Sequence, residues 1–131
     1  MIALDTNILV RFFMQDDPGQ LARVRAVLST LSTAAPAWIG LAVVQELAWV
    51  SMKVYGANRA DITLMLDRLL TMSEFHVEQA DVVRHAIRIY RTTKVAFSDC
   101  LISASAHAAG CTQILTFDQQ AAKTAGMTLI P

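Results

Sequence analysis

The sequence predicts an α/β fold in which a central, mostly parallel sheet of about five short strands is flanked by helices. Short apolar runs typical of buried strands alternate along the chain with longer segments whose apolar residues recur at helical spacing. Such alternation is typical of parallel sheets covered by helices on both faces. The 131 residues suffice for one hydrophobic core, so we expect a single domain over residues 1–131.

The first half of the chain opens with a short buried strand at Ile2 to Leu4. A helix begins at about Ile8, where Thr6 or Asn7 can cap it, and the cluster from Asp16 to Gly19 breaks it. The elements expected next are a helix at Gln20 to Leu31, a strand at Ala37 to Ile39, a helix at Leu41 to Met52 and a helix that starts after Asn58.

The second half repeats the alternation with shorter strands. Its third helix ends before Gly126, because glycine favours the backbone conformation that terminates helices. The elements expected are a strand at Phe75 to Val77, an amphipathic helix at Ala80 to Arg91, a helix capped by Ser98 that stops at Gly110, a strand at Gln113 to Thr116, a helix at Asp118 to Ala125 and a strand at Met127 to Ile130.

Composition excludes several classes of protein. The longest uncharged apolar run, Ala34 to Val44, is too short to cross a bilayer, and the N-terminus lacks the pattern of a signal peptide, so we expect a cytoplasmic protein. Two Cys and three dispersed His match no zinc-ligand spacing, and Cys100 and Cys111 are expected to be buried reduced thiols. A net charge of +0 gives no global attraction to nucleic acid, but the charge that remains after four acids neutralise metal ions is positive, so binding of a polyanion stays open.

Three stretches of the chain are strongly apolar, and every formally charged side chain in them is a carboxylate. A lone carboxylate is costly to bury unless a cation or hydrogen-bond donors meet it, and these acids have no basic neighbour in their own stretch. Four such acids indicate one shared metal site. The stretches are Met1 to Val10 with Asp5, Ala26 to Met52 with Glu46, and Val95 to Ala122 with Asp99 and Asp118.

Three of the four acids fall at the ends of predicted elements. Asp5 and Asp118 follow strands, and ligands of parallel α/β sheets bind beyond the carboxyl ends of strands. Asp99 lies in the first turn of its helix, whereas Glu46 lies mid-helix among apolar neighbours. Each acid alone has an ordinary interpretation, as a cap, a turn residue, a first-turn acid or an exposed helix residue. The set of four is what predicts a site.

Crowded carboxylates repel one another unless a cation stabilises their charged forms. Oxygen ligands favour a hard divalent ion, Mg²⁺ or Mn²⁺. Such ions activate water as hydroxide and stabilise the charge that develops in phosphodiester hydrolysis. The acids therefore favour metal-assisted hydrolysis over chemistry by a side-chain nucleophile.

Five segments that follow one another along the chain make it resemble the PIN-domain ribonucleases of the VapC toxin type. The resemblance runs from Met1 to Met127 and implies a PIN-like three-layer fold. It further implies an Mg²⁺- or Mn²⁺-dependent endoribonuclease that cleaves RNA, forms a homodimer and is inhibited by a cognate VapB antitoxin. The segments are Asp5-Thr6-Asn7, Asp16-Asp17-Pro18, Glu46 to Val50, Phe97 to Ile102 and Leu115 to Asp118.

The resemblance also implies roles for individual residues. We expect Asp5, Asp99 and Asp118 to hold the metal directly or through water, and Glu46 to orient or deprotonate the attacking water. We expect Thr6, Asn7 or Thr116 to support the metal site with a hydroxyl or amide group. Some relatives carry a further acid where this chain has Ala96, which leaves the number of metal ions open.

A cluster of basic residues offers a second candidate surface. Arg84, Arg88 and Arg91 lie opposite the apolar positions of their predicted helix, and Lys94 follows it. They predict either a solvated helix face or a groove for RNA.

Two other functions stay open. A phosphoacceptor or phosphotransfer domain would use Asp5, but receiver domains have adjacent acids after the first strand, and haloacid-dehalogenase-like enzymes have a second Asp where this chain has Asn7. A catalytically silent PIN-like binding module would have no need of all four acids.

Overall fold

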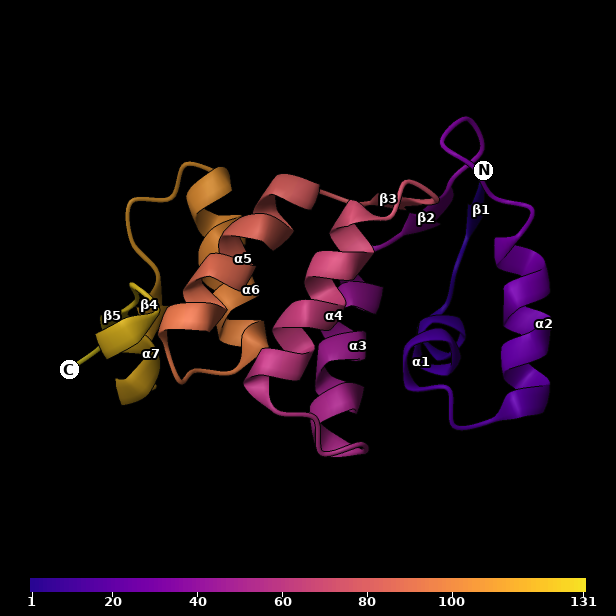
Figure 1. Ribbon diagram of the computed structural model, residues 1–131. Helices are drawn as coiled ribbons and strands as arrows, with labels where there is room; N and C mark the ends of the chain where they lie inside the picture. Colours follow the sequence, from indigo (N-terminus) through magenta and orange to yellow (C-terminus); the bar gives the residue numbers. More distant parts are fainter. The chain divides into compact units, whose positions relative to one another are not determined.

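The computed structural model describes all residues, 1–131, and confirms the α/β class with seven helices and five strands. The chain forms two compact units, Met1–Ala80 and Asp81–Pro131 (Figure 1). None of the helices has the length and apolar character needed to cross a membrane. The expected single domain over residues 1–131 stays a prediction.

Unit 1 is built on a three-stranded parallel sheet with the order β1, β2, β3. In this sheet Ala37 of β2 lies between Ile2 of β1 and Phe75 of β3. Its elements are β1 (Ile2–Ala3), α1 (Thr6–Met14), α2 (Pro18–Leu28), β2 (Ala37–Ile39), α3 (Leu41–Lys53), α4 (Arg59–Thr71) and β3 (Phe75–Val77).

The core of unit 1 forms where helices pack on one another and on the sheet. Helix α1 packs against α2 and α3, and α4 packs against α3 and β3. Helical spacing turns one face of each helix inward, so apolar side chains from all these elements are removed from water. The fully buried ones include Leu9, Ile39, Val44, Leu47, Leu66 and Leu69.

A polar network ties the α1–α2 loop to the α3–α4 loop. The Arg11 guanidinium donates to Asp16 Oδ1 at 2.8 Å, to the Tyr55 hydroxyl at 2.9 Å and to Gln20 Oε1 at 2.6 Å. The Tyr55 hydroxyl in turn donates to Asp16 Oδ2 at 2.8 Å. This bond and the Arg11 charge hold the pKa of the Asp16 carboxyl below its usual value. Residues 39 positions apart are thereby joined.

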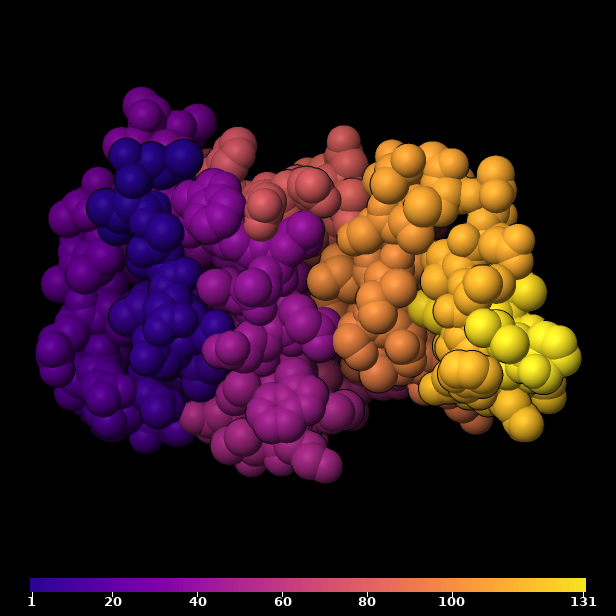
Figure 2. Space-filling model, turned by 180° about the vertical axis from the view of Figure 1, so that it is seen from behind, coloured from indigo at the N-terminus to yellow at the C-terminus, as the bar shows by residue number.

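Unit 2 comprises three helices and a two-stranded parallel sheet. The inward face of α5 buries Val83, Ala86 and Ile87, and the ring of Tyr90 meets that of Phe97 edge-to-face at 5.6 Å. Residues of β4, α7 and β5 form the yellow end of this unit's surface (Figure 2). Its elements are α5 (Ala80–Thr92, whose first residue belongs to unit 1), α6 (Phe97–Ala108), β4 (Leu115–Thr116), α7 (Gln119–Thr124) and β5 (Thr128–Leu129).

The five strands are parallel as expected, but they pair as a sheet of three and a sheet of two. The two C-terminal strands are shorter than predicted, with two residues each. The prediction of a buried first strand was wrong, because β1 is an edge strand and Ile2 is 47% exposed. Cys111 was also expected to be buried and is exposed, whereas Cys100 is buried.

Three helix starts differ from the prediction. Helix α1 begins at Thr6 and its N-cap is Asp5, not Thr6 or Asn7. Helix α2 begins at Pro18, because Asp17 caps it and proline suits the first position of a helix. Ser98 lies within α6, whose N-cap is Ala96.

We predict that Tyr55→Phe lowers the melting temperature of the protein at pH 7. The substitution removes the hydrogen bond that stabilises ionised Asp16 in the folded state. Because the pKa of Asp16 is lower in the folded state, its ionised form stabilises the fold at pH values above the unfolded-state pKa. This stability is lost as pH falls through the folded-state pKa. Thermal unfolding of both proteins between pH 7 and pH 2 should therefore converge at the acid end. An equal difference in melting temperature at every pH would contradict the assigned ion pairing.

Candidate functional site

Asp5 occupies the turn between β1 and α1. Leu4 N–H still donates to the Trp38 carbonyl of β2 at 3.1 Å, so the chain leaves the sheet only at Asp5. The Asp5 side chain then accepts a hydrogen bond from Thr6 N–H at 2.7 Å and caps the helix. Thr6 is buried, while Asp5 and Asn7 are exposed. One oxygen of an exposed carboxylate is thus held by the backbone.

Glu46 lies in α3, which begins beyond the end of the neighbouring strand β2. Parallel strands end at the same edge of a sheet, so Asp5 and the start of α3 share this edge of unit 1. The Glu46 side chain is exposed despite its apolar neighbours in sequence. The exposure of Glu46 by itself fits an ordinary residue on a helix surface as well as it fits a residue of a functional site.

A residue that the sequence did not single out fixes the start of α3. The N-cap of this helix is Gly40, which has no side chain to accept a hydrogen bond from the first turn, and a Cβ there would lie 3.0 Å from the Trp38 ring. Glu78, just after β3, supplies the missing acceptor, because its Oε1 accepts from Leu41 N–H at 2.8 Å. A glycine at an N-cap is the signal that a distant acceptor was needed. Glu78 therefore positions the helix that carries Glu46.

Asp99 and Asp118 are the two predicted site acids of unit 2. Asp99 lies half-buried in the first turn of α6. Asp118 is the N-cap of α7, with its Oδ1 accepting from Ala121 N–H at 3.0 Å. The Thr116 hydroxyl accepts from Asp118 N–H at 3.0 Å and so supports the same turn.

The two carboxylates of unit 2 interact. Burial raises the pKa of the Asp99 carboxyl above its usual value, and the negative charge of Asp118 raises it further. A cation between two such groups would relieve both penalties. Mg²⁺ is commonly held by one or two carboxylates together with water and substrate phosphates, so this oxygen-only pair fits such an ion.

Neither unit by itself gathers three or more His, Cys, Asp or Glu side chains into a group that could hold a metal ion. Unit 1 contributes Asp5 and Glu46, and unit 2 contributes Asp99 and Asp118. The predicted four-acid site therefore draws two acids from each unit, and its assembly stays a prediction.

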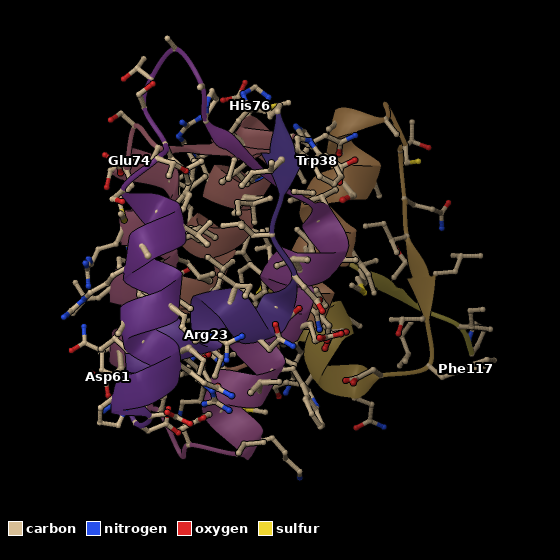
Figure 3. All side chains as sticks on the ribbon, turned by 90° about the vertical axis from the view of Figure 1, so that its right-hand side faces the viewer. Arg23, Trp38, Asp61, Glu74, His76 and Phe117 are labelled. Atoms are coloured by element: carbon tan, nitrogen blue, oxygen red, sulfur yellow. The ribbon has the colours of Figure 1, made fainter.

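A groove of about 400 Å³ lies between α1 and α2 of unit 1. It runs from Asn7, two residues beyond Asp5, to the apolar side chains of Val24 and Val27, and Arg23 of α2 points into it (Figure 3). Phe12, Phe13 and Leu21 of the same two helices do not line the groove. Leu21 is instead buried, and the guanidinium of Arg68 lies over both Phe rings at 5.9 and 5.5 Å. The remaining lining residues are Leu4, Ile8, Arg11 and Gln20.

The predicted basic surface lies on the outer face of α5. Arg84, Arg88 and Arg91 are exposed, and so is Lys94 beyond the helix. Arg84 donates to Asp81 at 2.7 Å, which neutralises part of its charge locally. A role for these four residues in RNA binding stays a prediction.

Comparison with known proteins decides the family. The PIN domain model matches residues 2–127. The chain belongs to the PIN domain family. It is also similar to a VapC ribonuclease of Aquifex aeolicus (strain VF5), with 26% identity over 132 residues that cover 100% of this chain and 97% of the relative. No solved structure matches it significantly.

The PIN match confirms the resemblance inferred from the five sequence segments and the α/β class that it implied. It spans both units, from β1 to the residue before β5. All four acids lie inside the matched range, as do Thr6, Asn7 and Thr116.

We predict that Asp99→Asn raises the melting temperature of the metal-free protein at pH 7. Asparagine keeps the shape of the side chain but removes the charge that burial and Asp118 penalise. The pKa of the Asp99 carboxyl is higher in the folded state than in the unfolded state. The folded protein therefore loses stability as pH rises from the unfolded-state pKa through the folded-state pKa. The gain from the substitution should therefore disappear near pH 3, where both proteins are neutral at this position. Thermal unfolding in EDTA across this range tests it, and an unchanged or lower melting temperature at pH 7 would contradict the assigned repulsion.

Proposed function

We propose that this PIN protein is an Mg²⁺- or Mn²⁺-dependent endoribonuclease and the toxin of a VapBC-type toxin-antitoxin pair. The observation that carries the proposal is the Asp99–Asp118 pair, whose mutual repulsion a divalent cation would relieve, within a chain of the PIN family. The similar Aquifex protein is named a ribonuclease, which supports RNA as the substrate.

The proposed function treats residues 1–131 as one PIN domain and requires the acids of both units to act on one cation. The edge of the sheet where β1 and β2 end supplies Asp5 and Glu46, and the starts of α6 and α7 supply Asp99 and Asp118. Ligands of parallel α/β sheets bind beyond the carboxyl ends of the strands, which supports a site at Asp5 and Glu46.

In the proposed reaction, Asp5, Asp99 and Asp118 would hold the cation directly or through water. When bound, the cation would activate water and neutralise charge on the phosphate. The carboxylate of Glu46 orients the attacking water and accepts its proton. The bond from phosphorus to the 3′-oxygen of the preceding nucleotide breaks, so one product carries a 5′-phosphate and the other a 3′-hydroxyl.

Residues around the acids keep them in place. Thr6 N–H holds one oxygen of Asp5, and the Thr116 hydroxyl holds the backbone of the Asp118 turn. Asn7 lines the α1–α2 groove, with its exposed amide beside the Asp5 turn. Such bonds fix a carboxylate before its ligand arrives, which reduces the entropy lost on binding.

The partners of this function are RNA, a VapB-like antitoxin and a second copy of the chain. The groove between α1 and α2 combines Val24 and Val27 with Arg11 and Arg23, a surface that suits an amphipathic antitoxin segment. The exposed basic face of α5 suits RNA phosphates. A toxin that cleaves cellular RNA works in the cytoplasm.

We predict that Asp5→Asn and Asp99→Asn each lower RNA cleavage in Mg²⁺ by about 100-fold or more, the scale of losing one electrostatic contact to a transition state. Asparagine is preferable to alanine at position 5, because loss of the Asp5 cap would itself cost about 0.5–2 kcal/mol of stability. Asp61→Asn is the matched control, since Asp61 is an exposed acid in the first turn of α4. Cleavage is followed on labelled RNA.

Cleavage at the wild-type rate by both Asp5→Asn and Asp99→Asn would contradict the nuclease assignment. Metal-dependent RNA binding without cleavage by the wild-type chain would instead identify a catalytically silent module. Incorporation of phosphate from acetyl phosphate at Asp5 would identify a phosphotransfer domain.

We further predict that cleavage stops in EDTA, returns with Mg²⁺ or Mn²⁺, and leaves 5′-phosphate and 3′-hydroxyl ends. These ends follow from attack by water instead of by the 2′-hydroxyl of RNA. End analysis of the products by phosphatase treatment and ligation distinguishes the two. A 2′,3′-cyclic phosphate, or full activity in EDTA, would contradict the mechanism.

A further inference from the structure

Two imidazole rings lie next to each other in unit 2. His85 of α5 and His107 of α6 have ring centroids 5.3 Å apart, and the ring planes are inclined at 75°. The proposed reaction uses neither ring. The spacing of His residues along the sequence matched no zinc site, because this pair comes from two different helices and only the packing of those helices brings it together.

Both rings line one pocket of unit 2, with a volume of about 400 Å³. His85 and Ile89 lie four residues apart on α5, and Ser103 and His107 lie four residues apart on α6. Residues at this spacing share a helix face, so each helix turns one face toward the pocket. The lining of the pocket includes no Asp or Glu. Imidazole nitrogens are therefore its principal candidates for binding a cation.

The helices that carry the rings are packed in place. The ring of Tyr90 on α5 meets that of Phe97 on α6 edge-to-face at 5.6 Å. The Ser103 hydroxyl donates to the Ala125 carbonyl at 2.7 Å, which ties α6 to the end of α7 on the wall of the pocket. A site on packed helices is better defined than a site on loops, so little has to be ordered when a ligand binds.

The nitrogens of both rings are available to a ligand. Neither imidazole has a hydrogen bond or an ion pair with another group of the protein. Burial lowers the pKa of the half-buried His85 below its usual value, and the charges of Arg88 and His107 lower it further. His85 is therefore neutral at pH 7. A neutral imidazole has the lone pair that binds a metal ion, whereas an anion would require the protonated form.

The chemistry of the pair selects the class of ion. Imidazole suits Zn²⁺, Cu²⁺ and Ni²⁺, whereas Mg²⁺ and Ca²⁺ require oxygen ligands, which the proposed four-acid site offers and this pocket does not. Zn–N bonds are about 2.0–2.1 Å long, so two rings bound to one ion have centroids on the order of 5 Å apart. The 5.3 Å between His85 and His107 agrees with such a shared ion. Arg88 opposes a cation here, but its side chain is exposed and water screens its charge.

We propose that His85 and His107 bind one Zn²⁺ ion per chain and that this ion joins α5 to α6. The structure holds no group of three or more His, Cys, Asp or Glu that could bind a metal ion, so the pair supplies two ligands and water supplies the others. An edge-to-face contact is also an ordinary way for two rings to pack, and binding of Zn²⁺ distinguishes the two interpretations.

The test is a calorimetric titration of the full chain with Zn²⁺ at pH 7, in millimolar Mg²⁺ that occupies the carboxylates. One ion should bind per chain. His85→Ala and His107→Ala should each weaken binding by at least about 10- to 100-fold, the loss that follows removal even of a group behind a metal ligand. Zn²⁺ should also raise the melting temperature of the wild type and not that of either variant, because an ion that binds only the folded state stabilises it.

Two control variants should keep the affinity for Zn²⁺. His76→Ala removes the third His of the chain, an exposed residue of β3 in unit 1, and Cys111→Ser removes the exposed thiol that lines the same pocket. Wild-type affinity in His85→Ala or His107→Ala would overturn the site. Loss of affinity in Cys111→Ser would also overturn it and mark binding by the thiol. Half an ion per chain would overturn it too, since this ratio marks an ion shared by two copies of the chain.

A measurement on the wild type keeps the site testable if the half-buried His85 cannot be replaced without unfolding. In proton NMR spectra, Zn²⁺ should shift the ring signals of two His residues and leave those of His76, which the spectrum of His76→Ala identifies. Unshifted signals, or a shift of His76 alone, would overturn the site. Both measurements follow metal binding without RNA, so their outcome does not depend on the proposed nuclease.

Discussion

The strand-to-helix turn closed by a carboxylate is the interaction on which the candidate site depends. It occurs once in each unit, where Asp5 follows β1 and caps α1 and where Asp118 follows β4 and caps α7. In both turns the backbone of the next helix engages one carboxylate oxygen, at 2.7 Å in the first and 3.0 Å in the second. Capping and ligand binding are therefore compatible, because a carboxylate has a second oxygen and further lone pairs. The ordinary cap and the proposed ligand are the same side chain.

More distant residues hold the helices behind these turns. Glu78 completes the start of α3 from beyond β3, and Tyr55 joins the α1–α2 loop to the loop after α3. Both supports are polar and bridge segments that lie far apart in sequence. A proposed catalytic group such as Glu46 depends on them, because the position of a side chain is only as well defined as the helix that carries it.

The two units differ in charge, which gives them different parts in the proposed reaction. Unit 1 has eight Asp or Glu side chains and six Lys or Arg side chains, whereas unit 2 has three and five. Unit 2 also carries the Asp99–Asp118 pair, in which burial and then the charge of Asp118 raise the pKa of Asp99. Cation binding at those acids would increase the positive charge that RNA meets. Metal and RNA binding are thus expected to reinforce one another.

The sequence by itself determined the α/β class, the order of helices and strands, and the position of all four acids on these elements. These properties follow from local periodicity and from the few residue types that start and end helices. The tertiary structure alone decided that the strands pair as three and two, that Asp99 and Asp118 interact, and that Glu78 caps a helix 37 residues away. It also decided that Cys111 and Phe117 stay exposed. Strand pairing, exposure and charge repulsion depend on contacts between residues that are distant in sequence, and no local pattern records those contacts.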